Sequence, residues 1–259
     1  MLLVVEVGNT NTKIGIFDGG RLKVSWRLTS RREQTADEYG LFIQTLLQTR
    51  GIAAGDIREI AMSNVVPSVQ QTLETMCEQY FGIAPFSLEP GTNTGMPLLV
   101  DQPREVGPDR LADAVAAREL YGAPAIVVNF GTATTFDCVS RQGEFLGGAI
   151  APGIVTATDA LLNRAARLYR VELVRPKEAI GRNTITNIQS GVVFGYAGLV
   201  DGIVDRMRAE MDGEPQVVAT GGQASLIAGV ARSIQHVNAD LALEGVRLIY
   251  EKSRGPRHG

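Results

Sequence analysis

Two short polar segments carry residue types that bind phosphate groups. The first is Gly8-Asn9-Thr10-Asn11-Thr12, which follows the apolar run Leu2–Val5 and has a carboxylate, Glu6, just before it. Glycine lets the backbone approach a ligand closely, and small polar side chains add hydroxyl and amide groups beside free N–H groups. Such a turn suits phosphate oxygens together with a hard cation. Taken alone it indicates little, because ordinary hairpins favour the same residues.

The same design occurs a second time, at 127–135. Three pairs of residues are each separated by 123 positions (129 − 6, 131 − 8 and 135 − 12): Glu6 with Asn129, Gly8 with Gly131, and Thr12 with Thr135. A glycine hairpin follows each copy, at 18–20 and at 141–143. Two strand–turn–strand units predict a duplicated α/β chain with domains at 1–122 and 123–259. We expect its two polar turns to face each other and hold one polyanion.

Bulk properties exclude several classes of protein. The chain has 259 residues and a net charge of −3 without a basic block, so nucleic acid and anionic membranes are not expected as partners. No apolar run approaches the roughly 20 residues of a membrane span, and the first strand begins without a basic leader, so we expect a cytoplasmic protein. Cys77 and Cys138 lie far from His236 and His258, which argues against a zinc site and for reduced, packed thiols.

Local signals in the first half define the elements that must position these turns. A hairpin is expected at 13–28, and Thr35 with Glu38 forms a capping box for a helix that Gly51 ends. A strand is expected at 57–64, and Ser68 is expected to cap the next helix. Residues 84–108 contain five prolines and read as an irregular binding loop.

Gly107-Pro108-Asp109-Arg110 closes that loop and opens a helix at 111–120. Pro108 suits the first helical position, which leaves Asp109 in the first turn, where the helix dipole favours its ionised form. A helix-stabilising carboxylate and a catalytic one are both compatible with this position.

The second half repeats the alternation of strands and helices. We expect a strand from Ala125, a glycine-rich return at 145–153, a helix at about 155–168 and a long helix after Asn183-Thr184. A further strand at 217–219 ends in Thr220-Gly221-Gly222, where a flat ring or a ribose could lie against the backbone. The last helix is expected at 241–252.

Several common motifs are missing from the sequence. It contains no G-x-x-x-x-G-K-[ST] loop, and neither strand is followed by G-x-G-x-x-G. Two histidines do not support a catalytic triad. If the protein handles a nucleotide, the two turns and the Gly-Gly pair must hold it.

An ordered series of motifs resembles the type III pantothenate kinases, a bacterial family that includes the Bvg accessory factors. The motifs span the chain and are Glu6–Thr10, Ser63–Pro67, Gly107–Arg110, Asn129–Thr135, Gly147–Gly153, Asn183-Thr184 and Thr220–Gly222. The resemblance implies the duplicated ribonuclease-H-like fold of the actin and sugar-kinase superfamily, with a cleft between two similar domains. It also implies a homodimer that uses ATP with Mg²⁺ or Mn²⁺ and a monovalent cation, K⁺ or NH₄⁺, to phosphorylate pantothenate, the first step towards coenzyme A.

The resemblance also implies roles for individual residues. Asp109 would accept the proton of the substrate hydroxyl. The ATP-binding residues would be Glu6, Gly8, Asn9, Thr10, Asn11, Thr12, Lys13, Gly131, Thr132, Ala133, Gly221 and Gly222. The pantothenate-binding residues would be Asn9, Val100, Gly107, Pro108, Asp109, Arg110 and Thr184, the last from the neighbouring subunit. Glu6 and Asn129 would be the metal ligands.

Three positions depart from the family pattern, which has Asp at both 6 and 129 and an aromatic residue at 100. Glu6 keeps the charge one methylene farther out, and Asn129 keeps only a carbonyl oxygen. Three hypotheses follow: an active pantothenate kinase with an altered cation shell, a nucleotide- or metabolite-binding regulator without turnover, and a kinase for another small alcohol. Intact Asp109 and Arg110 favour the first, and Asn129 favours the second.

Overall fold

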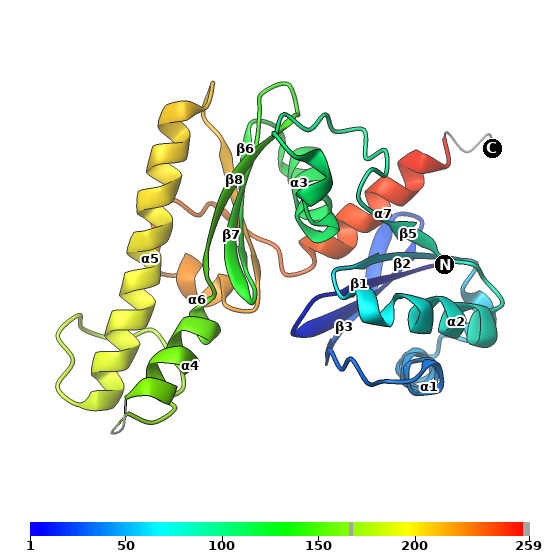
Figure 1. The fold of residues 1–259 in the computed structure, drawn as a ribbon, viewed down its shortest axis with the longest axis horizontal. Coiled ribbons are helices and arrows are strands. Elements are labelled where there is room, and N and C mark those ends of the chain that lie inside the picture. The colour runs from blue at the N-terminus through cyan, green and yellow to red at the C-terminus, as the bar shows by residue number, and fades with distance from the viewer. Residues whose placement is uncertain (166–167, 256–259) are drawn as a thin grey trace. The chain divides into compact units, whose positions relative to one another are not determined.

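The computed structural model describes residues 1–165 and 168–255, which form two compact units (Figure 1). The first unit contains residues 1–95, 102–116 and 242–255, and the second contains 96–101, 117–165 and 168–241. The end of the chain therefore groups with its beginning. The predicted domain boundary after residue 122 follows the duplication in the sequence. In the structure, the final helix belongs to the first compact unit, although it follows the second unit in sequence.

A five-stranded sheet forms the centre of the first unit. Its order is β3-β2-β1-β4-β5, with β1 and β2 antiparallel, β2 and β3 antiparallel, and β1, β4 and β5 parallel. The strands are β1 (Leu2–Val7), β2 (Asn11–Asp18), β3 (Arg21–Thr29), β4 (Glu59–Asn64) and β5 (Phe86–Leu88). The hairpin expected at 13–28 is thus confirmed.

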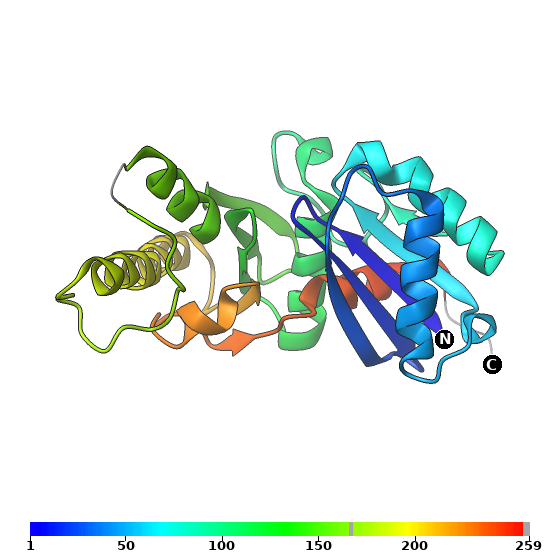
Figure 2. The same ribbon diagram turned by 90° about the horizontal axis from the view of Figure 1, so that it is seen from below.

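Two helices, α1 (Ala36–Gln48) and α2 (Gln70–Phe81), cover one face of this sheet (Figure 2). Their apolar side chains pack on Leu3, Val5 and Val7 of β1. The capping box of α1 is present, since the Thr35 side chain accepts from Glu38 N and the Glu38 side chain accepts from Thr35 N.

The expected cap at Ser68 is wrong. Residues Pro67–Val69 form a short 3₁₀ helix, η2, and α2 begins after it at Gln70 without a side-chain cap. Pro67 opens this turn, because its fixed φ suits a helix start and places the first turn before the expected one.

The opposite face of the sheet carries Glu6 and is covered by α7 (Leu241–Ser253). Gly15, whose strand position faces this side, leaves room for Leu243, since a Cβ at Gly15 would lie 3.0 Å from Leu243 Cδ1. The Arg247 guanidinium lies 5.5 Å from the centre of the Phe17 ring. The start of α3 (Pro108–Tyr121) packs closely on α7, where a Cβ at Gly245 would overlap the backbone of Ala112.

The second unit repeats the topology of the first. Its sheet has the order β10-β9-β6-β7-β8, with the same parallel and antiparallel pairings as β5-β4-β1-β2-β3. The strands are β6 (Ala125–Phe130), β7 (Ala133–Val139), β8 (Phe145–Pro152), β9 (Gln216–Gly221) and β10 (His236–Val237). The duplication predicted from the two polar turns is confirmed.

After the polar turn, the correspondence between the two copies of the repeat shifts by one residue. Glu6 pairs with Lys13 across its hairpin, whereas the corresponding residue Asn129 pairs with Thr135. Thr135 is therefore the structural equivalent of Lys13, and its expected match with Thr12 is wrong. The cause is a shorter connection, because β6 ends at Phe130 and β7 begins at Ala133.

Three helices, α4 (Ile154–Arg164), α5 (Thr184–Glu210) and α6 (Ala224–Ala228), belong to the second unit and lie on one side of its sheet (Figure 1). Their apolar residues pack with Ile126, Val128 and Phe130 of β6. Asn183 caps α5 by accepting a hydrogen bond from Thr186 N at 3.0 Å. The helix expected at 155–168 ends earlier, at Arg164, and residues 166–167 of it lie outside the described residues.

The stretch 84–108 is more regular than expected. It contains β5 and a 3₁₀ turn, η3 (Pro103–Glu105), and another 3₁₀ turn, η1 (Ala54–Asp56), lies earlier in the chain. Leu98 also bridges Phe145 at the start of β8. β5 has only three residues, at the edge of its sheet, and so short a strand has no pattern that can be detected in the sequence.

Two expectations from composition can be compared with the fold. Both cysteines are free and buried, as expected for packing residues. Within the described ranges, every helix is either too short or too polar to cross a membrane.

The crossing of α1 and α2 depends on a glycine, and this gives a first prediction. A Cβ at Gly40 would lie 2.5 Å from Tyr80 Cγ and 2.6 Å from Tyr80 Cε2. We expect Gly40→Ala to lower the free energy of unfolding by about 1–3 kcal/mol through overpacking, despite the better helix propensity of alanine. Gly198→Ala is the matched control, because Gly198 lies in α5 with no atom near its missing Cβ. Chemical denaturation checks both variants, and equal stabilities would contradict the prediction.

Candidate active site

The first polar turn connects β1 and β2 and is held by a serine that the sequence analysis missed. Gly8 N donates to Asn11 O at 2.9 Å. The Ser30 hydroxyl donates to Gly8 O at 2.7 Å and lies 2.9 Å from the Thr12 hydroxyl. Asn9, Thr10 and Asn11 are exposed at the tip of this turn. Ser30 is 22 residues from Gly8 in sequence, so no local pattern indicates this contact.

Glu6 lies at the base of the same turn and is only 8 % exposed. The pKa of its carboxyl is raised to about 7, mainly by burial and also by the nearby Asp109 carboxylate, against the opposing charges of Lys13 and Arg27. Loss of hydration disfavours the charged form of an acid, and so does a neighbouring negative charge. Glu6 is therefore poised between its protonated and ionised forms near neutral pH.

Asp109 stands in the first turn of α3, where Pro108 is the first helical residue, as expected. Burial raises the pKa of its carboxyl, while a hydrogen bond from the backbone N–H of Arg110 and the Arg110 charge oppose this increase. A Cβ at Gly107 would lie 2.5 Å from Asp109 Oδ1, so only glycine leaves this carboxylate its position. The first unit thus brings Glu6 and Asp109 together.

The Glu6 carboxylate, with Asp109 nearby, fits a magnesium ion that also binds substrate phosphates. Among residues 1–165 and 168–255, no cluster of three or more His, Cys, Asp or Glu side chains forms a metal cage. Mg²⁺ in phosphoryl-transfer enzymes is commonly bound through one or two protein carboxylates and the phosphates. A divalent cation would also relieve the repulsion between Glu6 and Asp109.

Asn129 occupies the equivalent strand position in the second unit. It is half-buried, and its partners across the neighbouring strands are Thr135 on β7 and Thr220 on β9. Residues paired in this way extend to the same face of the sheet. The Thr220 hydroxyl is fully buried and has no hydrogen-bond partner within the described part of the chain. An amide and neutral hydroxyls are oxygen donors that fit a monovalent cation.

The second polar turn and the Gly-Gly pair lie at the same edge of this sheet, at the ends of β6 and β9. Gly131 N donates to Ala133 O at 3.0 Å, and Gly222 N donates to Phe130 O at 3.0 Å. Gly221 has φ +93°, and a Cβ there would lie 2.5 Å from Phe130 O. The second unit therefore brings Asn129, the 131–133 turn and Gly221-Gly222 together.

Two other predicted residues occupy separate places in the second unit. Val100 lies beside β8, since a Cβ at Gly147 would be 3.5 Å from its Cγ1. Thr184, the first residue of α5, lines a groove of about 530 Å³ between α4 and α5, which is also lined by Leu161 and Tyr196. Arg110 is half-buried and follows Asp109 in α3.

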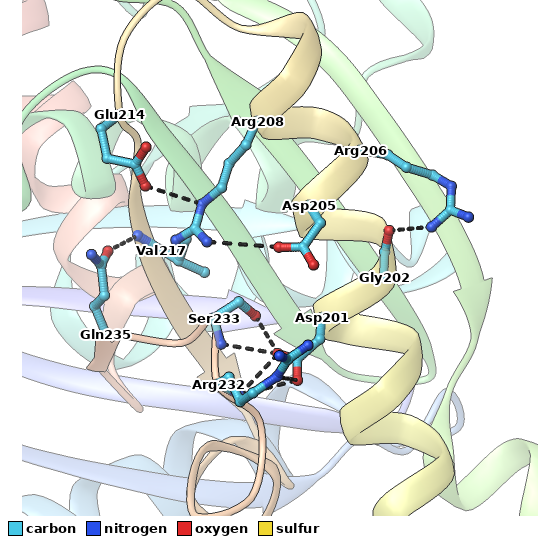
Figure 3. Close-up of polar contacts among 10 residues, drawn as sticks. All are labelled: Asp201, Gly202, Asp205, Arg206, Arg208, Glu214, Val217, Arg232, Ser233 and Gln235. Carbon is cyan, nitrogen blue, oxygen red and sulfur yellow. Dashed lines mark hydrogen bonds and ion pairs between the residues drawn. The ribbon is translucent and has the colours of Figure 1, made fainter.

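A buried aspartate of α5, Asp201, fixes the segment that follows α6 (Figure 3). Its carboxylate accepts from Arg232 N at 2.9 Å, from Ser233 N at 2.9 Å and from the Ser233 hydroxyl at 2.8 Å. Burial alone would raise the pKa of Asp201, but the hydrogen bonds from Ser233 and Arg232 outweigh it and hold that pKa below its usual value. α6 follows the Gly221-Gly222 turn directly in sequence. The Asp201 contact therefore fixes the segment after the C-terminal end of α6.

The two matching sheets and their connecting helices define a class of protein. They form the duplicated ribonuclease-H-like fold of the actin and sugar-kinase superfamily. Solved structures agree: an activator of 2-hydroxyisocaproyl-CoA dehydratase from Clostridium difficile, with bound ADPNP, has a TM-score of 0.55 at 11% identity over 100% of this chain and 98% of its own. The (R)-2-hydroxyglutaryl-CoA dehydratase component A of Acidaminococcus fermentans also has a TM-score of 0.55, at 13% identity over 98% of each chain.

Sequence comparison identifies the family within this class. The profile of the type III pantothenate kinases matches residues 2–206. A type III pantothenate kinase of Moorella thermoacetica is 52% identical over 98% of this chain and 100% of its own length. One of Geobacter sulfurreducens is 50% identical over 98% of this chain and 100% of its own length. The chain belongs to the type III pantothenate kinase family.

The Asp201 contact gives a prediction on stability and pH. Its folded-state pKa is depressed, so its contribution is present above the unfolded value of about 3.9 and is lost as the pH falls through the folded value. We expect Asp201→Asn to lower the free energy of unfolding by about 1.5–3 kcal/mol at pH 7, with a smaller loss below about pH 4.

Asp205→Asn is the matched control for Asp201→Asn. Asp205 lies on the same helix and makes an ion pair with Arg208 at 3.8 Å, but its side chain is 59% exposed. We expect this variant to change stability by less than about 1 kcal/mol. Urea unfolding at pH 7 and at pH 3.5 checks both variants, and a pH-independent effect of Asp201→Asn would show that its charge contributes nothing.

Proposed function

We propose that this protein transfers the γ-phosphoryl group of ATP to the primary hydroxyl of pantothenate, which yields 4'-phosphopantothenate and ADP. The observation that carries the proposal is the pair Glu6 and Asp109 beside the first polar turn, in a chain of this family. This reaction is the first step of coenzyme A synthesis and takes place in the cytoplasm.

Asp109 is the proton acceptor of the proposed reaction. The pantothenate oxygen forms a bond to the γ-phosphorus as its proton passes to Asp109, and the bond from the γ-phosphorus to the bridging oxygen of ADP breaks. The raised pKa of Asp109 brings its basicity closer to the working pH, which favours general-base catalysis. Phosphoryl transfer otherwise needs mainly positioning and neutralisation of charge.

Glu6 would hold Mg²⁺ or Mn²⁺, and Asn129 with Thr220 would hold a monovalent cation, K⁺ or NH₄⁺. Bound cations of this kind supply positive charge that neutralises the phosphate oxygens. The chain contributes Gly8–Lys13 and the 131–133 turn as donors to the phosphates, and Gly221-Gly222 as the surface for adenosine.

Pantothenate recognition would rest on the residues around Asp109. The Arg110 guanidinium can pair with the pantothenate carboxylate in a fork geometry, which lysine cannot reproduce. Asn9, Gly107 and Pro108 would line the same site, and Val100 would complete it. Thr184 would reach the pantothenate of a neighbouring subunit in a homodimer.

A second candidate is a regulatory protein that binds nucleotide or a related metabolite without turnover. Glu6 and Asn129 favour it, because the family carries Asp at both positions. A third, favoured by Val100, is a kinase for another small alcohol. An ATP-consumption assay with pantothenate, with and without Mg²⁺ and K⁺, separates them: binding without turnover selects the regulator, and turnover with other alcohols alone selects the third.

Asp109→Asn tests the proton acceptor. We expect turnover with pantothenate to fall by about 10²–10⁴-fold, because asparagine accepts no proton, while ATP affinity stays within about twofold. Steady-state kinetics and nucleotide titration provide the measurement. Asp212→Asn, at an exposed position after α5, serves as the control. A loss of folding stability that accounts for the loss of activity would restrict Asp109 to a structural role in α3.

Glu6→Asp tests the altered metal ligand. We expect the shorter side chain to lower the Mg²⁺ concentration needed for half-maximal turnover, because Mg²⁺ tolerates little distortion of its ligand shell. Glu6→Gln is the comparison, and it should raise that concentration because it removes the charge. Mg²⁺ titrations of the initial rate decide the matter. The same Mg²⁺ requirement in all three proteins would remove Glu6 from the metal site.

A further inference from the structure

The second phosphate turn is held from behind by the start of α4. The carbonyl oxygen of Thr132, in the middle of this turn, accepts two hydrogen bonds. The Thr156 hydroxyl donates at 2.8 Å, and Gly153 N donates at 3.2 Å. Gly153 is the residue that precedes the first turn of α4, and Thr156 lies within that turn. Both donors come from one rigid element that follows β8 directly (Figure 1).

The fit between Gly153 and the turn leaves no room for a side chain. Gly153 is buried, and a Cβ on it would lie 2.5 Å from Gly131 O and 2.7 Å from the carbonyl carbon of Thr132. The atoms that this Cβ would overlap all belong to the backbone, so no side chain can move away to relieve the overlap. A glycine at 153 is therefore needed because of this close approach, since its own φ of −68° suits any residue.

Fixing the Thr132 carbonyl also fixes the next N–H group. A peptide unit is planar and trans, so its N–H points away from its C=O. When α4 holds the Thr132 oxygen, the N–H of Ala133 points in the opposite direction within the same peptide plane. The negative end of the peptide is then turned into the protein. This is the orientation that a turn needs if it is to offer N–H groups, and not carbonyl oxygens, to an anion.

The same end of α4 is tied to the long helix α5. The Tyr196 hydroxyl of α5 donates to Pro152 O at 2.9 Å, one residue before Gly153. Ala157 N donates to Gly153 O at 2.8 Å and closes the first turn of α4. The support behind Thr132 is thus anchored in a packed helix of the second unit.

We propose that Thr156 and Gly153 are positioning residues that orient the 131–133 turn for the phosphates of ATP. They act through the Thr132 carbonyl and make no contact with the substrate themselves. This inference rests on the proposed function, because it takes the 131–133 turn as a phosphate-binding turn. It assigns to the start of α4 a role that differs from helix packing alone.

The experiment compares ligands that carry phosphates with one that does not. Calorimetric titration measures the affinities of wild type, Thr156→Val and Thr156→Ser for ATP, ADP and adenosine. Valine keeps the shape of threonine without its hydroxyl, and serine keeps the hydroxyl. We expect Thr156→Val to bind ATP and ADP about threefold to tenfold more weakly and adenosine equally well, and Thr156→Ser to regain most of the lost affinity. In steady-state kinetics the change should appear in KM for ATP and leave KM for pantothenate unchanged.

Gly153→Ala provides a second variant with a larger expected effect. Backbone displacement by the new Cβ should weaken ATP binding more than tenfold and again spare adenosine, with Gly198→Ala as the control for a glycine substitution that meets no atom. Circular dichroism and thermal unfolding verify that each variant is folded, and the Thr156 variants decide the matter if Gly153→Ala is not.

The outcomes separate this inference from the proposed function. Equal losses for ATP and adenosine, or unchanged ATP affinity in folded Thr156→Val, would overturn the positioning role while the kinase assignment stands. A wild-type chain that binds neither ATP nor ADP would overturn the proposed function, and the positioning role with it.

Discussion

The burial of one acidic side chain, Glu6, constrains much of the first unit. Its strand places it on the sheet face that α7 covers, and the start of α3 brings a second carboxylate, Asp109, close enough to raise its pKa. Two neighbouring carboxylates with little water around them favour a proton or a cation between them. The local backbone is adapted to this arrangement, because Gly107 leaves the space that the Asp109 carboxylate occupies. A pair of buried carboxylates, which is unfavourable for folding, is thus the arrangement that suits the proposed chemistry.

The two units solve the same problem with different charges. In the first unit the end of the central strand carries a carboxylate. In the second unit the equivalent strand carries the amide of Asn129 beside the Thr220 hydroxyl, which has no hydrogen-bond partner among the described residues. A carboxylate suits a small divalent cation, whereas neutral oxygens suit a larger monovalent one. In the proposed kinase, the two copies of the turn would therefore differ in role: the first would neutralise charge strongly, and the second would contribute weaker coordination and hydrogen bonds.

Local signals predicted the elements that depend on neighbours in sequence. The capping box at Thr35, the helix start at Pro108 and both hairpins could be read directly, because each uses residues a few positions apart. The helix cap predicted at Ser68 was wrong because Pro67 starts a 3₁₀ turn before it. β5 was not predicted because only three of its residues pair, at the edge of the sheet.

Contacts between distant residues left no such trace. Ser30 under the first turn, Asp201 behind α6 and Thr156 behind the second turn are ordinary polar residues in the sequence. Their roles come from partners 22, 32 and 24 positions away, and only the folded chain brings these partners together. The motifs therefore predicted the turns, whose role in ligand binding stays a prediction, and the structure was needed to find what holds those turns in place.

The return of α7 to the first unit affects how the protein is made. A ribosome releases the chain from its N-terminus, and domains generally fold as units during this process. Here the sheet face that carries Glu6 lacks its cover until Leu243 and Arg247 have been synthesised, after the whole of the second unit. The second unit can complete its core first, although its sequence comes later. The face that carries Glu6 thus stays uncovered until the chain has been made as far as α7, and a chain that stops before α7 lacks this cover.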